Sequence, residues 1–177
     1  MTDRLHPMPA SKPSSTLPRC YVASPLGFTA SGRHYYTNVL LPALSRVVHP
    51  VDPWALTSGG EWARVAREGR THELARLAGR RNSDAIRSCA LLVAILDGQE
   101  VDAGTAAEVG FGAALGLTCL GLRTDLRTTG EAGTTVSLQV ESFIEQSGGH
   151  VFDQLDDLLA DLGARHRPTG APGCGPV

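Results

Sequence analysis

The 177-residue sequence lacks the features that mark membrane-spanning, secreted and nucleic-acid-wrapping proteins. Its formal net charge is only -2 and it has no long basic run, so binding of a nucleic acid polymer through bulk electrostatics is not expected. No apolar stretch approaches the ~20 residues that a bilayer-spanning helix needs. The N-terminal stretch MTDRLHPMPASKPSSTLPR has no apolar centre, so it does not have the pattern of a secretory signal.

The chain also lacks the usual motifs of metal and cofactor sites. Its four cysteines form no CxxC pair and its six histidines are scattered, so no metal site is predicted. Cys20, Cys89 and Cys119 lie in or beside apolar runs, as buried free thiols of a cytoplasmic protein do. There is no GxGxxG, GxxxxGK[ST] or GxSxG motif. We therefore predict a cytoplasmic protein that needs no cofactor.

The composition, with 42% hydrophobic and 19% charged residues, is typical of one globular domain. Residues 1–18 are rich in proline and indicate a disordered arm, and the Pro/Gly-rich residues 164–177 indicate a flexible tail. The folded domain is predicted to span residues 19–163.

Within this domain, apolar runs of strand length alternate with segments of helical periodicity. ALLVAILDG, at 90–98, is typical of a strand that is buried on both faces. Strands are predicted within 19–28, 47–54, 90–98, 117–125 and the start of 150–162, and helices within 32–47, 59–89 (one or two), 104–116, 136–148 and the end of 150–162. Pro42 weakens the first helix. The alternation predicts an α/β fold, a doubly wound (Rossmann-like or flavodoxin-like) parallel five-stranded sheet with helices on both faces.

Ligands of such sheets bind beyond the carboxyl ends of the strands. Asp97 and Asp102 are predicted to lie at this edge, and Gly104 begins the following helix. Glu108 then falls about one turn inside the helix, where the helix dipole favours an ionised carboxylate that can act as a nucleophile. The alternative is a purely structural role, in which Glu108 is an exposed helix residue and Asp102 caps the helix. Spacing alone leaves the two interpretations open.

Residues 82–127, NSDAIRSCALLVAILDGQEVDAGTAAEVGFGAALGLTCLGLRTDLR, resemble the core of the nucleoside 2-deoxyribosyltransferase family. The frame is a buried strand, then D-x-G-T-x-x-E-[IV]-G, a small-residue helix, another strand and R-x-D-x-R. YVASPLGF resembles the first strand and loop of the family, and VSLQVESFIEQSGG its closing segment. The resemblance runs from about Arg19 to Leu162. It implies the fold predicted above and an enzyme that acts on nucleosides.

The resemblance also implies a mechanism, in which Glu108 attacks C1′ of a 2′-deoxynucleoside to form a covalent deoxyribosyl-enzyme. A second base then attacks C1′, and configuration is retained. Asp102 is expected to contact the base and help its protonation, and Tyr21 to hold the nucleophile. The residue that contacts the base from the preceding segment is Asn82 or, by a short offset, Asp84.

Other site residues are implied less directly. Ser24, Pro25 and Phe28 are expected to line the pocket, with Phe28 as a stacking surface for the base. Many members of the family have an Asn in the closing segment that binds the sugar hydroxyls in the neighbouring subunit. Here Ser137 takes that position, with Gln139 as possible compensation, so sugar binding departs from the family pattern. The shared site implies a homodimer or larger homo-oligomer.

Three functions remain open from the sequence. The first is transfer of 2-deoxyribose between nucleobases. The second is hydrolysis of a nucleoside or a nucleoside 5′-monophosphate by an N-glycosidase of the same superfamily, with water in place of the acceptor base. The third is a non-catalytic nucleotide-binding or sensing module. RTDLR, residues 123–127, is either a salt-bridged loop or part of the pocket wall, and Trp54 and Trp62 are either stacking or packing residues.

Overall fold

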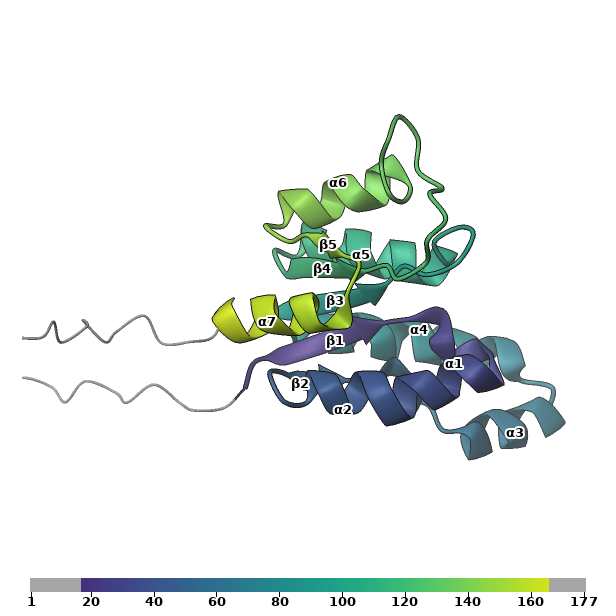
Figure 1. Ribbon diagram of the computed structural model, residues 1–177. Helices are drawn as coiled ribbons and strands as arrows, with labels where there is room; N and C mark the ends of the chain where they lie inside the picture. The colour runs from purple at the N-terminus through teal and green to yellow at the C-terminus, as the bar shows by residue number, and fades with distance from the viewer. Residues whose placement is uncertain (1–16, 166–177) are drawn as a thin grey trace, which may run out of the picture.

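In the computed structural model, which describes residues 17–165, five parallel strands form one sheet in the order β2-β1-β3-β4-β5 (Figure 1). The strands are β1 (Arg19–Ala23), β2 (His49–Val51), β3 (Leu91–Ile95), β4 (Thr118–Leu122) and β5 (Val151–Phe152). This order is that of flavodoxin-like doubly wound sheets, so the predicted fold class is confirmed. The predicted arm and tail, 1–18 and 164–177, lie almost wholly outside the described residues.

Helices connect the strands and cover both faces of the sheet (Figure 1). They are α1 (Ala30–Tyr35), α2 (Leu41–Leu44), α3 (Gly59–Arg67), α4 (Thr71–Arg87), α5 (Ala103–Ala114), α6 (Leu138–Gln146) and α7 (Leu155–Arg165). The segment 59–89, predicted as one or two helices, is two. Gly69 separates them with a φ of 69°, a left-handed conformation that glycine adopts without a steric cost. Gly116, the predicted end of the fifth helix, likewise has a φ of 83°.

Pro42 does not break the first helical run, but it changes its winding. Between α1 and α2 the chain forms a π-helical stretch, η2 (Tyr36–Leu40), directly before Leu41 and Pro42. Proline has no N–H to donate, and its ring clashes with the carbonyl four residues earlier in an ordinary α-helix. A wider turn relieves this clash, and π-bulges are the usual form of such a turn.

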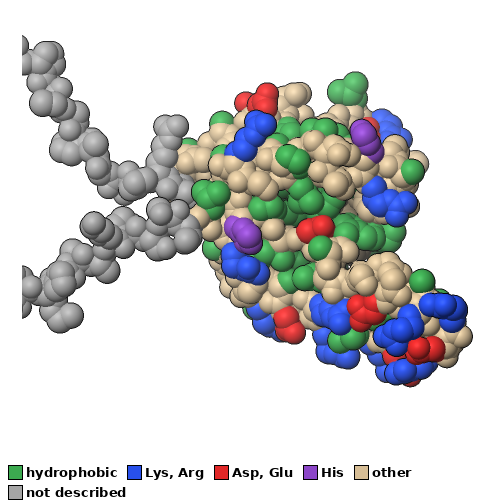
Figure 2. All heavy atoms as spheres, turned by 90° about the horizontal axis from the view of Figure 1, so that it is seen from below, with side chains coloured by type: hydrophobic (Ala, Val, Ile, Leu, Met, Phe, Trp, Pro, Cys, Tyr) green, Lys and Arg blue, Asp and Glu red, His purple; other side chains and the backbone are tan. Residues whose placement is uncertain are grey.

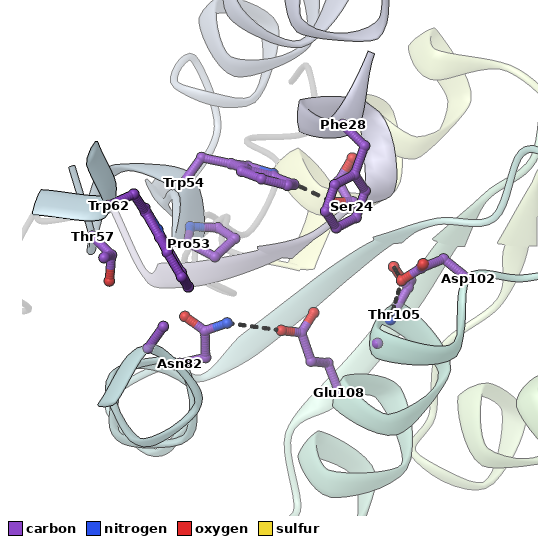
Figure 3. Close-up of a pocket in the computed structure, with 12 residues that line it drawn as sticks. Ser24, Phe28, Pro53, Trp54, Thr57, Trp62, Asn82, Asp102, Thr105 and Glu108 are labelled. Atoms are coloured by element: carbon purple, nitrogen blue, oxygen red, sulfur yellow. Dashed lines mark hydrogen bonds between the residues drawn. The ribbon is translucent and has the colours of Figure 1, made fainter. Parts of the chain in front are cut away.

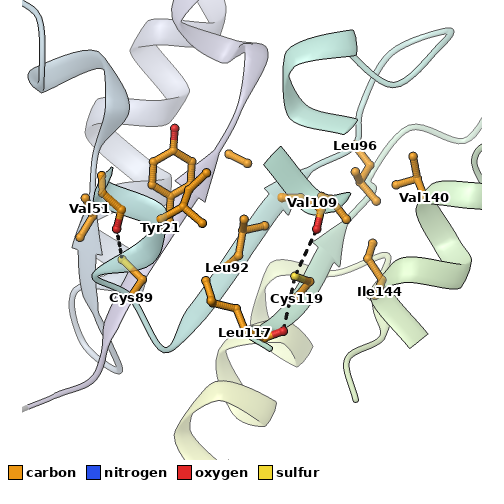
Figure 4. Close-up of a cluster of buried hydrophobic side chains, with 14 of the residues drawn as sticks. Tyr21, Val51, Cys89, Leu92, Leu96, Val109, Leu117, Cys119, Val140 and Ile144 are labelled. Carbon is orange, nitrogen blue, oxygen red and sulfur yellow. Dashed lines mark hydrogen bonds between the residues drawn. The ribbon is translucent and has the colours of Figure 1, made fainter. Parts of the chain in front are cut away.

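Two apolar cores lie on opposite faces of the sheet, because alternate residues of a strand point to opposite sides. On one face, Tyr21, Leu92 and Cys119 pack with side chains from α4, α5 and α6 (Figure 4). On the other face, Val22 and Val93 pack with side chains from η2, α2 and α7. β3, in the centre of the sheet, is buried at all five positions, as its unbroken apolar sequence predicted.

The surface differs between the two ends of the molecule. Figure 2 shows Lys/Arg and Asp/Glu side chains crowded together on one projecting end, on the side where Figure 1 places α3. Ion pairs there include Arg64–Glu68 and Arg70–Glu73. Hydrophobic side chains are spread over the middle of this face. Among residues 17–165, no helix is long and apolar enough to cross a membrane.

Candidate active site

A pocket of about 280 Å³ lies at the carboxyl edge of the sheet, where the loop after β1, the segment after β2, α3, α4 and the start of α5 meet (Figure 3). Six residues that the sequence singled out line it: Ser24, Phe28, Asn82, Asp102, Gly104 and Glu108. Tyr21 lies beneath and reaches the pocket through Glu108. The rest of the lining comprises Pro53, Trp54, Thr57, Trp62, Ala78 and Thr105.

Glu108 is held in place by two side chains from different elements. The Tyr21 hydroxyl, on β1, donates a hydrogen bond of 2.6 Å to Glu108 Oε1, and Asn82 Nδ2, on α4, lies 3.4 Å from the same oxygen. Oε2 accepts no hydrogen bond from the described residues, so it is available to a ligand. The interpretation of Glu108 as a merely exposed helix residue is therefore wrong.

The charge state of Glu108 reflects opposing effects. Burial raises the pKa of its carboxyl group, and the nearby charge of Asp102 raises it further. The hydrogen bonds from Tyr21 and Asn82 act in the opposite direction, since they stabilise the carboxylate. The sequence predicted that the helix dipole would favour ionisation, and burial acts in the opposite direction. Burial raises the pKa of Tyr21 as well, so its hydroxyl keeps its proton and remains a donor.

Asp102 both caps α5 and lines the pocket. Its Oδ2 accepts hydrogen bonds from Thr105 N at 2.9 Å and from Thr105 Oγ1 at 3.3 Å, as an N-cap residue does. Oδ1 receives no hydrogen bond from the described residues. The two sequence interpretations of Asp102 are thus compatible, because one oxygen fixes the helix start while the other stays free for a ligand.

Three aromatic side chains form the apolar part of the pocket. Trp54 is fixed in position: its Nε1 donates to the carbonyl oxygen of Ser24 at 3.3 Å, and its indole lies against Gly27. A Cβ atom at Gly27 would come within 2.1 Å of the indole ring. Phe28, which is 71% exposed, meets Trp54 edge to face with a centroid distance of 4.7 Å. Together with Trp62, these rings offer flat apolar surface to a ligand.

Besides Tyr21, five predicted site residues do not line this pocket. Asp84 points outward and lies 3.7 Å from Arg87, so the structure brings Asn82 and not Asp84 beside Glu108. Pro25 begins the 3-10 turn η1 (Pro25–Phe28) and is not part of the lining. Ser137 and Gln139 lie at the start of α6, away from the pocket of their own chain.

The fifth predicted residue outside the pocket is Asp97, whose carboxylate is hydrogen-bonded to the loop that follows β4. Its carboxylate accepts hydrogen bonds from Thr124 N at 2.5 Å, Asp125 N at 2.9 Å and Thr124 Oγ1 at 2.8 Å. The buried Arg123 guanidinium, from the same loop, donates hydrogen bonds to the carbonyl oxygen of Leu96 at 2.5 Å and to that of Gly98 at 3.2 Å. The RTDLR segment therefore ties the ends of β3 and β4 together, and it lines no part of the pocket.

The sequence did not assign Trp54 and Trp62 to the site, because lone tryptophans are more often packing residues. Pro53 and Thr57 were missed for a similar reason, since the segment after β2 has no motif. Only their place in the chain could have indicated that these residues line the site. The segment follows a parallel strand, so it begins at the same edge of the sheet as the other loops.

A half-buried carboxylate beside flat apolar surface suits a sugar carbon that gains positive charge as a planar base departs. The protein is accordingly a glycosyl-transferring or N-glycoside-cleaving enzyme. More particularly, the chain belongs to the nucleoside 2-deoxyribosyltransferase family, whose family model matches residues 20–159. This match confirms the resemblance seen in the sequence.

Solved structures show the same fold. A 2-desoxiribosyltransferase from Leishmania mexicana is 26% identical, with a TM-score of 0.64 over 85% of this chain and 99% of that one. A conserved protein from Enterococcus faecalis V583 is 22% identical, with a TM-score of 0.60 and the same coverage. CMP N-glycosidase from Clostridium botulinum is 16% identical, with a TM-score of 0.50 over 81% and 97%, and its likeness concerns the fold alone. No curated protein is similar enough to count as a match.

Proposed function

We propose that this protein is a nucleoside 2-deoxyribosyltransferase that acts through a covalent intermediate on Glu108. The observation that carries the proposal is the 2.6 Å hydrogen bond from Tyr21 to Oε1 of a half-buried Glu108 whose second oxygen is free. A carboxylate held by one oxygen presents the other in a fixed direction, which is what an attack on a sugar carbon requires.

In the first step, Glu108 Oε2 bonds to C1′ of a 2′-deoxynucleoside as the C1′–N bond breaks. The bonding electrons leave with the base, and the protonated carboxyl group of Asp102, which lines the pocket, gives its proton to a ring nitrogen of that base. In the second step a ring nitrogen of another base attacks C1′, the bond from C1′ to Glu108 breaks, and the Asp102 carboxylate takes up the proton of the incoming base. Two displacements retain the configuration at C1′.

The aromatic surface is proposed to hold the base while it departs and while its replacement enters. Phe28, Trp54 and Trp62 supply flat apolar area, and Ser24 and Asn82 supply polar groups at its margin. The same pocket accepts leaving and entering bases in turn, so a binding surface without strict hydrogen-bond demands suits the reaction.

We further propose that the enzyme is a homo-oligomer in which Ser137 and Gln139 serve the site of a neighbouring subunit. Both lie outside the pocket of their own chain. Leu138, which lies between them in the chain, is 48% exposed, and Leu126 is 99% exposed; such apolar side chains are candidates for burial between subunits. Light scattering on the purified protein should give a multiple of the 18.6 kDa chain mass.

The test of the proposed reaction is an exchange assay. The purified protein is mixed with a deoxynucleoside and an excess of a different base, with and without a 5′-phosphate on the sugar. Exchanged deoxynucleoside is the expected product. Free base without exchange, even at high acceptor concentration, would indicate the N-glycosidase, and no turnover of any substrate would indicate a sensing module. Glu108→Ala should abolish the chemistry while the variant still binds the base.

A further inference from the structure

A second cavity, of about 330 Å³, lies on the other side of the tryptophans. It shares Trp54, Thr57 and Trp62 with the pocket that contains Glu108, so the two spaces meet along this pair of indoles. Gly59 and Thr37 line the second cavity and not the first. The distant wall is therefore built from the first residue of α3 and from η2, at positions that do not line the pocket around Glu108.

The two tryptophans differ in how they are fixed. Trp54 is anchored by its hydrogen bond to Ser24 and by its contact with Gly27. Trp62 is 37% exposed, and its indole nitrogen donates no hydrogen bond to the described residues. Figure 3 shows Trp62 crossing the side of the pocket opposite Asp102, between Pro53 and Asn82. A group that extends from the pocket on this side reaches the second cavity past Trp62.

The helix that carries Trp62 is tied to the body of the protein through Arg81. The Arg81 guanidinium, on α4, bonds to Glu61 at 3.0 and 3.1 Å, and it donates to the Leu56 carbonyl and to Thr57 Oγ1, both at 3.1 Å. These bonds join α3 and the segment that carries Thr57 to α4, and so they fix the side of the second cavity that contains Trp62.

The second cavity has both polar and apolar lining. The Tyr36 hydroxyl and Trp54 N both donate to Asp52 Oδ1, at 2.9 Å each, so this oxygen is already engaged. Arg33 and Thr37 are exposed at the rim. The indole faces supply the apolar part of the lining, which suits a substituent with an apolar body whose outer end reaches solvent.

We propose that the second cavity is a subsite for an exocyclic substituent of the nucleobase. This inference rests on the proposed function, because the base must lie with its glycosidic nitrogen over Glu108. Its opposite edge then faces the tryptophans, and a group attached to that edge enters the second cavity. The substrate class is therefore nucleobases with a bulky exocyclic group, such as an adenine that carries a benzyl group on its exocyclic nitrogen.

The test introduces larger side chains at residues that line the second cavity and not the first. Gly59→Leu adds a side chain at a residue that lines this cavity, and it does so without a clash because a Cβ atom at Gly59 meets nothing within 4 Å. Gly60→Leu is the matched control: Gly60 is the next residue of α3 and lines neither cavity. Calorimetry then measures the affinity of each protein for adenine and for N6-benzyladenine. Gly59→Leu should weaken the binding of N6-benzyladenine about tenfold or more relative to adenine, and Gly60→Leu should leave the ratio unchanged.

Thr37→Phe provides a second variant from the opposite side of the cavity, and it should lower the same ratio. Equal binding ratios in the wild type and all three variants would overturn the subsite, as would failure of the wild type to bind N6-benzyladenine. These binding measurements do not depend on turnover. A protein that shows the expected ratios but exchanges no base in the assay above would retain the subsite and lose the proposed reaction.

Discussion

Replacing Tyr21 with Phe removes one hydroxyl group and leaves the aromatic ring in the core. The lost contact is the 2.6 Å hydrogen bond to Glu108 Oε1. Hydrogen bonds to a charged group contribute about 1.5–3 kcal/mol, and tenfold in rate corresponds to about 1.4 kcal/mol. If Glu108 is the nucleophile, kcat/KM should fall about ten- to hundredfold, because the carboxylate loses the donor that directs it.

The pH dependence gives a second readout of the same variant. The hydrogen bond from Tyr21 lowers the pKa of Glu108, so its removal raises that pKa further above the ordinary value for a glutamate. The reactive form is the carboxylate. The acid limb of the kcat/KM profile should therefore move to higher pH, and part of the activity should return as the pH rises.

Tyr35→Phe is the matched control for this experiment. Tyr35 is half-buried, it lines neither cavity, and its hydroxyl makes no hydrogen bond to the described residues. Its loss should change neither the rate nor the acid limb. The reasoning about Tyr21 would be refuted if Tyr21→Phe lowered kcat/KM by less than about threefold and left the acid limb in place, with base binding and thermal stability intact.

Three further predictions follow from the site. Burial raises the pKa of Glu108 above its unfolded value, so its ionisation costs stability once the pH rises through the ordinary glutamate range. Glu108→Gln should thus raise Tm at pH 7 by roughly 2–4 °C, but not at pH 4. Arg123→Met should destabilise the fold by about 3 kcal/mol in urea titrations, whereas the exposed Arg127→Met changes little. Gly27→Ala should displace Trp54 and weaken base binding in calorimetry.

Most of the fold could be predicted from the sequence because burial leaves a strong pattern. The run LLVAI of β3 is apolar at every position, and only a strand covered on both faces needs that. Helix ends were predictable where glycine follows the last turn, as at Gly116 and Gly148, which have φ values of 83° and 81°. The π-helical turn before Pro42 was not predicted, because sequence shows that a clash exists but not how the backbone relieves it.

The candidate site was predictable only in part. Asp102 and Glu108 belong to one short segment, so their relation follows from helix geometry. Asn82 and Asp84 are two residues apart on α4 and therefore point to different sides of the helix. The choice between them depends on the rotation of that helix against the sheet, which sequence spacing does not give.

The sequence by itself determined the order of strands and helices along the chain, the edge of the sheet at which the pocket lies, and the presence of Asp102 and Glu108 there. These features depend on local periodicity and on the parallel arrangement that it imposes. The resemblance already implied that Tyr21 holds Glu108, and the structure has that hydrogen bond. Only the tertiary structure decided that Asp97 bonds to the loop after β4 and that Trp54 and Trp62 line two cavities at once. Such contacts join residues far apart in the chain, so they depend on how the elements pack and not on the spacing within any one of them.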